Sequence, residues 1–314
     1  MPNTAILFIV FNRPDLTTQV FEKIKLAKPS RFFVAADGPR VFLQNDQSLC
    51  EETRKIVLDN IDWPCEVFTL LQKENLGCKK AVSGAINWFF EHVEEGIILE
   101  DDCLPDISFF NFCSTLLERF RNDETIFHIS GSNFQFSEVG NGSYYLSKIP
   151  HIWGWASWRR AWKYYDVELK NFDATQTSTY FNDLEIDLYW KKTFTKTQNK
   201  EIDTWDYQWG HTLLYHKKYA ILPQYNLVKN IGFDERGSRT QYKNDKFANL
   251  KTYNISPIVH PQNLCYKPFA DIIFHHISGM KYTLYSKYIS GKMSLKILTN
   301  KFSYSILKKN WFDI

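Results

Sequence analysis

Continuous apolar runs alternate with amphipathic stretches along the first third of the chain. Residues 5–11, AILFIVF, are apolar and end at the polar segment Asn12-Arg13-Pro14-Asp15. From Leu16 to Leu26 the apolar residues recur at roughly helical spacing, and Lys28-Pro29 ends that pattern. The next run, RFFVAA, leads into Asp37-Gly38-Pro39, a turn sequence. Strand, helix and strand in this order predict a parallel β-α-β unit.

The same alternation continues to the end of a key strand. We expect a polar helix around Glu51 to Asn60, a strand from Cys65 to Leu71, and a loop, QKENLGCKKA, that opens a helix ending near His92. Residues 97–99, Ile-Ile-Leu, then run directly into Glu100-Asp101-Asp102, and Pro105 prevents the strand from continuing. Open α/β sheets bind ligands just beyond the carboxyl ends of their strands, which is where Asp37 and the acidic triplet lie.

Beyond Phe120 the chain changes character. The β-like runs become shorter, and a dense aromatic segment, IPHIWGWASWRRAW, occupies residues 149–162. We interpret residues 1–265 as one catalytic domain, with a nucleotide-binding half at 1–120 and an acceptor half at 121–265. Residues 266–314 form a basic, aromatic C-terminal extension.

Composition narrows the function classes. Aromatic residues make up 17% of the 314, and besides building a core, such rings suit the apolar C–H faces of sugars. A net charge of +3 is too small to indicate a nucleic-acid partner. Six cysteines at irregular spacings, with no CxxC pair, predict neither a zinc site nor a disulfide framework. The apolar N-terminal run is too short for a signal sequence or a membrane span, so we expect a cytoplasmic protein.

The acidic triplet is the strongest chemical feature. Three consecutive carboxylates repel one another, so a cation or good solvation must compensate them. Mg²⁺ and Mn²⁺ suit this role, because they take one or two carboxylates together with substrate phosphates and waters. The alternative is a solvated acidic turn or a helix N-cap. Placement after an apolar strand favours the metal.

The acidic triplet and three later segments resemble the motifs of a known enzyme family. The segment GIILEDDCLPDISFF resembles the acidic metal motif of GT-A glycosyltransferases, in particular N-acetylglucosaminyltransferase I and related bacterial nucleotide-diphospho-sugar transferases. Gly154 to Trp158 is similar to that family's Gly-Trp motif, and Thr204 to Trp209 is similar to its Trp-acid-acid-Trp segment. Residues 220–239 are similar to the following strand and donor-covering loop. The resemblance implies a Rossmann-like mixed, mostly parallel sheet flanked by helices, and a single displacement with inversion.

The resemblance also implies residue roles. Asp102 would bind Mn²⁺ or Mg²⁺, and Glu100 and Asp101 would lie at the diphosphate. Asp206 is the candidate general base, with Asp203 as its rival because Tyr207-Gln208 replaces the family's second acid; Asp206 could instead only cap a helix. Further candidates for nucleotide-sugar binding are Phe11, Asn12, Arg13, Asp37, Arg40, Asn75, Gly77, Lys79, Lys80, Trp155, Gly237 and Ser238.

Several of these candidates could instead have a structural role or lie on the surface. Asp37 would hydrogen-bond the base, and Arg13 and Arg40 would pair with phosphate or ribose, although either arginine could be a surface side chain. Asn75, Gly77 and the two lysines would present helix N-terminal amides and charge to an anion, or form a solvated Lys pair. Trp155 would stack on the acceptor or belong to the core. Gly237 and Ser238 would close over the donor or lie in a plain surface loop.

The leading interpretation is a transferase that uses a UDP-sugar, with UDP-N-acetylglucosamine as the favoured example, and a saccharide or lipid-linked saccharide acceptor in surface polysaccharide biosynthesis. The basic tail from about residue 280 would lie on the inner face of the membrane or pack as a solvated helix. Two alternatives stay open. One is a catalytically inactive carbohydrate-binding or scaffold protein on the same fold. The other is a sugar-nucleotide pyrophosphorylase, whose Gly-rich N-terminal loop is missing from FIVFNRPD.

Overall fold

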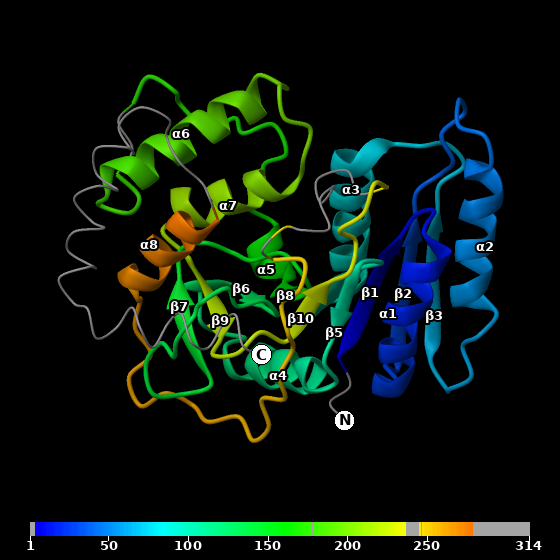
Figure 1. The fold of residues 1–314 in the computed structure, drawn as a ribbon, viewed down its shortest axis with the longest axis horizontal. Coiled ribbons are helices and arrows are strands. Elements are labelled where there is room, and N and C mark those ends of the chain that lie inside the picture. Colours follow the sequence, from blue (N-terminus) through cyan, green and yellow to red (C-terminus); the bar gives the residue numbers. More distant parts are fainter. Residues whose placement is uncertain (1–3, 177–178, 237–244, 246, 279–314) are drawn as a thin grey trace.

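A computed structural model describes residues 4–176, 179–236, 245 and 247–278, and its centre is an eight-stranded mixed sheet with the order β3-β2-β1-β4-β8-β6-β9-β7 (Figure 1). Four strands of the first half are parallel: β1 (Ala5–Val10), β2 (Arg31–Ala36), β3 (Glu66–Leu71) and β4 (Glu95–Glu100). In the second half β6 (Ile126–Ser130) and β9 (Tyr219–Pro223) are parallel to each other. The remaining two, β7 (Tyr144–Ser147) and β8 (Trp155–Trp158), run antiparallel to their neighbours.

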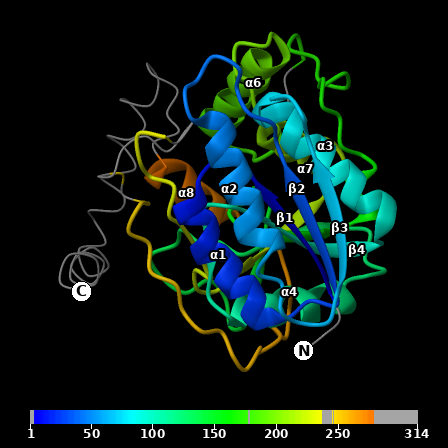
Figure 2. The ribbon, with the colours of Figure 1, turned by 90° about the vertical axis from the view of Figure 1, so that its right-hand side faces the viewer.

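Helices cover both faces of this sheet, which explains why β1 is apolar at every position. Ile6, Phe8 and Val10 face a cluster with α1 (Pro14–Ala27), α2 (Asp46–Leu58) and α4 (Ser108–Arg119). The alternate residues Leu7 and Ile9 face a second cluster with α3 (Gly77–His92), α5 (Arg159–Trp162) and α7 (Asp206–Tyr215). Figure 2 shows α1 and α2 on one side of the strands and α3 on the other. The predicted fold class, an α/β sheet flanked by helices, is confirmed.

The elements of the first half largely match the sequence pattern. The helix expected around Glu51 to Asn60 begins earlier, at Asp46, because that side chain is buried at the helix start and pairs with Arg40. The strand predicted at residues 97–99 runs from Glu95 to Glu100, so it includes the first residue of the triplet and ends before Pro105 can act on it. Pro105 then closes a separate short strand, β5 (Cys103–Pro105), which pairs antiparallel with β10 (Val228–Asn230).

The second half was predicted only in outline. Its aromatic segment forms β8, which lies between β4 and β6 and is buried throughout. Two longer helices that the sequence pattern did not predict, α6 (Leu184–Gln198) and α7, pack against each other and, with α8 (Pro268–Ile277), enclose a third aromatic cluster around Trp190 and Phe194.

Some expectations fall outside the described residues. These are the donor-covering residues Gly237 and Ser238 and the basic tail from residue 279 onward. Within the ranges that the structure describes, the helices are too short or too polar to cross a bilayer.

Candidate active site

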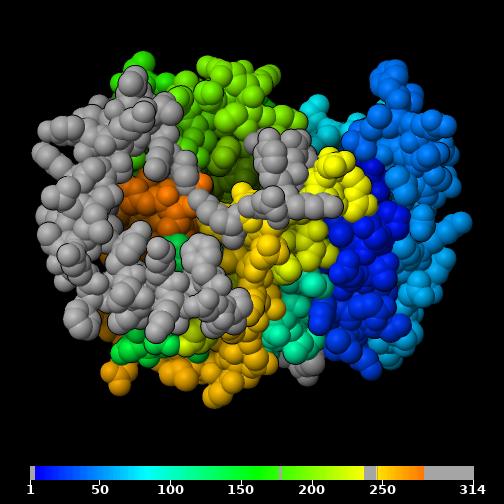
Figure 3. Space-filling view, viewed as in Figure 1, coloured from blue at the N-terminus to red at the C-terminus, as the bar shows by residue number. Residues whose placement is uncertain are grey.

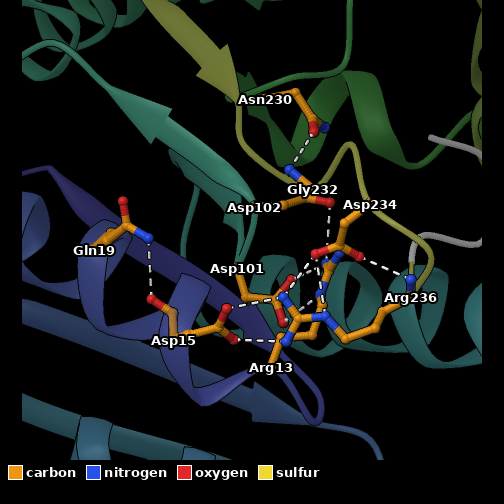
Figure 4. Close-up of polar contacts among 9 residues, drawn as sticks. All are labelled: Arg13, Asp15, Gln19, Asp101, Asp102, Asn230, Gly232, Asp234 and Arg236. Atoms are coloured by element: carbon orange, nitrogen blue, oxygen red, sulfur yellow. Dashed lines mark hydrogen bonds and ion pairs between the residues drawn. The ribbon is translucent and has the colours of Figure 1, made fainter. Parts of the chain in front are cut away.

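The carboxyl ends of β1 and β4 meet at one edge of the sheet, and this brings Arg13 to the acidic triplet. The parallel register pairs Ile9 with Glu100, so the residues after each strand are neighbours. The Arg13 guanidinium binds the carboxylate of Asp101 through both Nη2 and Nε, and Nη2 also lies 3.0 Å from Oδ2 of Asp102 (Figure 4). Arg13 therefore supplies part of the positive charge that the triplet requires.

One arginine does not neutralise three carboxylates. Burial, together with the charges of Asp102 and Asp101, raises the pKa of Glu100 to about 8, and the charge of Asp206 adds to this. Burial raises the pKa of Asp101 as well, against the opposing effect of Arg13. A further cation at this edge would relieve the remaining repulsion, which is the electrostatic setting of a divalent metal site.

The pairing of β5 with β10 places a second segment against the triplet. The Ile231 N–H donates to the carbonyl oxygen of Asp102 at 2.8 Å, and the Gly232 N–H donates to Oδ1 of Asn230 at 2.8 Å. A Cβ on Gly232 would lie 2.5 Å from Oδ2 of Asp102 and 2.9 Å from Nη1 of Arg13. A larger residue here would therefore force the side chains of Asp102 and Arg13, which Figure 4 shows beside Gly232, to shift.

The loop after Gly232 is fastened to the start of α1. Arg236 donates to both carboxylate oxygens of Asp15 at 2.8 Å and to Oδ2 of Asp234 at 2.7 Å. Figure 3 shows the yellow segment that contains this loop lying against the blue N-terminal part of the surface. Arg236 and Asp15 are each about half exposed, so the pair contributes little to stability and can open. Sequence patterns did not indicate this contact.

The carboxylates suit a metal held mainly by its substrate. Among the described residues no three His, Cys, Asp or Glu side chains converge in the way that a metal cage held by protein ligands requires. The side chain of Asp101 is 4% exposed and bound to Arg13, whereas that of Asp102 is 14% exposed. Mg²⁺ usually binds one or two carboxylates plus substrate phosphates, and Asp102 fits that donor set.

Asp206 begins α7 and is held by its neighbours. Its Oδ1 accepts hydrogen bonds from the Thr204 hydroxyl and, at 2.9 Å, from the Tyr207 N–H. The charge of Asp206 makes a small contribution to the raised pKa of Glu100. Asp203 is exposed in the loop before α7.

Asp37 has a different role from the one expected. Its carboxylate accepts from Asn75 Nδ2 at 2.9 Å and from the N–H groups of Gly38, Leu76 and Gly77 at 2.8, 2.9 and 3.2 Å. These four bonds fill its acceptor capacity, so contact with a nucleotide base would require some of them to break. The amides at the start of α3, expected to bind a phosphate, instead bind Asp37.

Asp46, which the sequence did not single out, organises the neighbouring loop. Its carboxylate accepts from Asn12 Nδ2, from the Arg40 N–H at 2.7 Å and from Arg40 Nη2 at 2.8 Å. The hydrogen bonds from Arg40 lower the pKa of Asp46 to about 2. The Arg40 guanidinium also lies over the Phe11 ring, 5.1 Å from its centroid. Arg40 and Asn12 thus both bind Asp46, and the side chain of Arg40 stays 45% exposed.

Lys79 and Lys80, which follow Asn75, lie in different surroundings. Lys79 lies 3.3 Å from Oε1 of Glu168, whereas Lys80 is exposed. Neither contacts the triplet through any interaction that the structure records.

The proposal of acceptor stacking by Trp155 is wrong. Its ring is 1% exposed and stacks between His128 and Trp205, with centroid distances of 5.0 and 5.8 Å, so no sugar can reach it. Its place in the core follows from the central position of β8.

Comparisons with known proteins give only distant likenesses. No protein-family model and no curated protein sequence matches the chain. A structure of UDP-glucose pyrophosphorylase complexed with UDP-glucose aligns with a TM-score of 0.38 and 8% identity over 72% of this chain and 92% of the other. Galactosyltransferase LgtC, in complex with donor and acceptor sugar analogs, aligns with a TM-score of 0.35 and 11% identity over 67% of this chain and 70% of the other. HddC from Yersinia pseudotuberculosis aligns with a TM-score of 0.31 and 10% identity over 50% of this chain and 77% of the other. All three TM-scores lie below 0.5, so no activity is inferred from them.

Proposed function

We propose that this chain is a glycosyltransferase that moves a sugar from a nucleotide diphosphate sugar to an acceptor hydroxyl. The observation that carries the proposal is the assembly of Arg13, Asp101, Asp102 and Gly232 beyond the carboxyl ends of β1 and β4. This is the position at which open α/β sheets bind ligands. Its excess of carboxylates suits a cation that is shared with a diphosphate.

In this proposal each residue has a distinct task. Arg13 binds Asp101 and fixes the turn after β4, so that the more accessible Asp102 would be presented to Mn²⁺ or Mg²⁺. The metal, when bound, would stabilise negative charge on the leaving diphosphate. Gly232 allows the loop to approach this carboxylate, and the exposed Arg236–Asp15 pair joins the loop to the start of α1.

Asp206 is the general base of the proposal. Both hydrogen bonds that fix its carboxylate fall on Oδ1, so we assign Oδ2 to the proton of the acceptor hydroxyl. Following the family resemblance, the transfer would invert the anomeric centre. The favoured donor is UDP-N-acetylglucosamine, and the acceptor would be a saccharide or a lipid-linked saccharide.

Calorimetric titration tests the donor site. UDP, GDP, CDP and dTDP are titrated with and without Mn²⁺ into the wild type, Asp102→Ala and the surface control Asp59→Ala. We expect one nucleotide to bind the wild type only when the metal is present. This binding should persist in Asp59→Ala and should be lost in Asp102→Ala. Failure of every nucleotide to bind the wild type would overturn the proposal and favour a scaffold protein.

A second assay separates the proposed transferase from a pyrophosphorylase. The bound nucleotide's sugar conjugate is incubated with pyrophosphate, and the products are analysed for a nucleoside triphosphate. A transferase releases the nucleoside diphosphate only as the sugar passes to an acceptor hydroxyl or to water, and makes no triphosphate. Formation of the triphosphate would assign the chain to the pyrophosphorylases.

A further inference from the structure

Trp153 lies just before the buried strand β8. Trp155 and Trp158 of the same segment are 1% exposed, whereas Trp153 is half-buried. The antiparallel pairing of β8 with β4 ends where Trp155 lies opposite Ile98. Trp153 and Glu100 each lie two residues beyond this last pair.

Gly154, the next residue, packs between two strands that flank the triplet. A Cβ on Gly154 would lie 2.9 Å from Cγ2 of Val228 and 3.1 Å from Cδ2 of Leu99, the residue before Glu100. Gly154 has a φ of 63°, a left-handed conformation that suits glycine, and its carbonyl accepts from the Gly131 N–H at 2.7 Å. The chain therefore turns immediately after Trp153, at the end of the paired region.

The indole is also joined to the loop that covers Asp102. The Phe233 ring lies 5.8 Å from it at 88°, and the Phe134 ring lies 5.1 Å from it at 78°, so neither neighbour stacks flat on the indole. Phe233 directly follows Gly232, which packs against Asp102. The Ser132 hydroxyl donates to the Trp153 carbonyl at 2.9 Å and fixes the backbone. Trp153 is thus linked through Phe233 to the loop that packs against Asp102.

We propose that Trp153 binds the apolar face of the donor's sugar ring. The inference rests on the proposed function, which places the diphosphate at Asp102. The sugar is attached directly to that diphosphate, and the ring of Trp153 contacts Phe233, the residue after Gly232, which packs against Asp102. Pyranose rings carry a patch of C–H bonds on one face, and an indole packs well against such a patch. Trp153 would thereby favour a sugar conjugate over the bare nucleotide.

Paired titrations test this assignment. UDP and UDP-N-acetylglucosamine are titrated in Mn²⁺ into the wild type, Trp153→Leu, Trp153→Phe and Trp88→Leu, where Trp88 is a half-buried tryptophan on α3. If the wild type prefers another diphosphate, that nucleotide and its glucose conjugate are used. We expect Trp153→Leu to bind the conjugate about threefold to tenfold more weakly and the bare nucleotide equally well. Trp153→Phe should retain most of the affinity, and Trp88→Leu should change neither ligand.

The possible failures are distinguishable. Equal weakening of both ligands by Trp153→Leu would indicate a structural role, and no weakening of either would indicate no contact; each overturns the sugar assignment and leaves the proposed function intact. Absence of nucleotide binding to the wild type would instead overturn the proposed function, and this assignment with it.

Discussion

Arg13 and Asp101 form a buried ion pair that joins the residues following two neighbouring parallel strands. The pair lies 88 residues apart in sequence, and its side chains are 14% and 4% exposed. Because Nη2 of the same arginine reaches Asp102, the pair sets the position of the whole acidic turn.

Removing this arginine should destabilise the protein. Arg13→Met leaves Asp101 buried without its partner, and we expect the free energy of unfolding in urea to fall by about 3 kcal/mol. The double variant Arg13→Met, Asp101→Asn should recover part of this loss because the unpaired charge is gone. A double variant whose loss equals the sum of the two single losses would show that the two side chains are not coupled.

A methyl group at Gly232 should damage the candidate site. Its Cβ would lie 2.5 Å from the Asp102 carboxylate, so we expect Gly232→Ala to weaken metal-dependent nucleotide binding at least about tenfold and to cost about 1–3 kcal/mol in stability. Gly84 in α3 is the matched control, since a Cβ there meets nothing within 4 Å. Gly84→Ala should stabilise the helix by about 0.5–1 kcal/mol. Equal behaviour of the two variants would contradict the close approach at Gly232.

Kinetics of single variants should show which of two aspartates, Asp206 or Asp203, acts as the general base. Asp206→Asn should reduce kcat by about 100-fold or more while the donor KM changes little, because a general base acts only in the chemical step. Asp203→Asn, in the exposed loop before α7, should leave kcat within about twofold. The reverse pattern, measured by steady-state transfer, would move the base to Asp203.

The Asp46 and Arg40 pair predicts a pH-dependent contribution to stability. The pKa of Asp46 is lowered from 3.8 to about 2, so the folded state favours the ionised carboxylate. A carboxyl with a lowered pKa stabilises the fold above its unfolded pKa, and this contribution, about 2 kcal/mol, is lost as the pH falls from about 5 toward 2. Urea unfolding should therefore show wild type and Asp46→Asn converging in stability across that window. A difference that stays constant from pH 6 to pH 2.5 would refute it.

The first half of the fold and the acidic triplet were predictable because their determinants are local. Apolar runs such as residues 5–11 identify buried parallel strands, and Glu100 to Asp102 follow such a run directly. Asp206 stands out through a short motif. These features can be recognised without knowing which distant segments of the chain are in contact.

The partners of these residues could not be predicted, because they depend on contacts between distant segments. Arg13 could equally have faced solvent, and its pairing with Asp101 depends on the register of β1 with β4. The importance of Gly232 depends on the pairing of β10 with β5. The burial of Trp155 follows from the insertion of β8 into the sheet centre, which no local pattern specifies.

The insertion of β8 between β4 and β6 has a consequence for the two halves of the chain. The outer edge of β4, which would otherwise end the sheet built by residues 1–120, is hydrogen-bonded along Glu95 to Ile98 by a strand from residues 121–265. A fragment ending at Phe120 would expose that edge and the apolar faces beside it, and exposed edges of this kind recruit other chains. We therefore expect the two halves to depend on each other for folding, and neither to be exchangeable between proteins as an independent module.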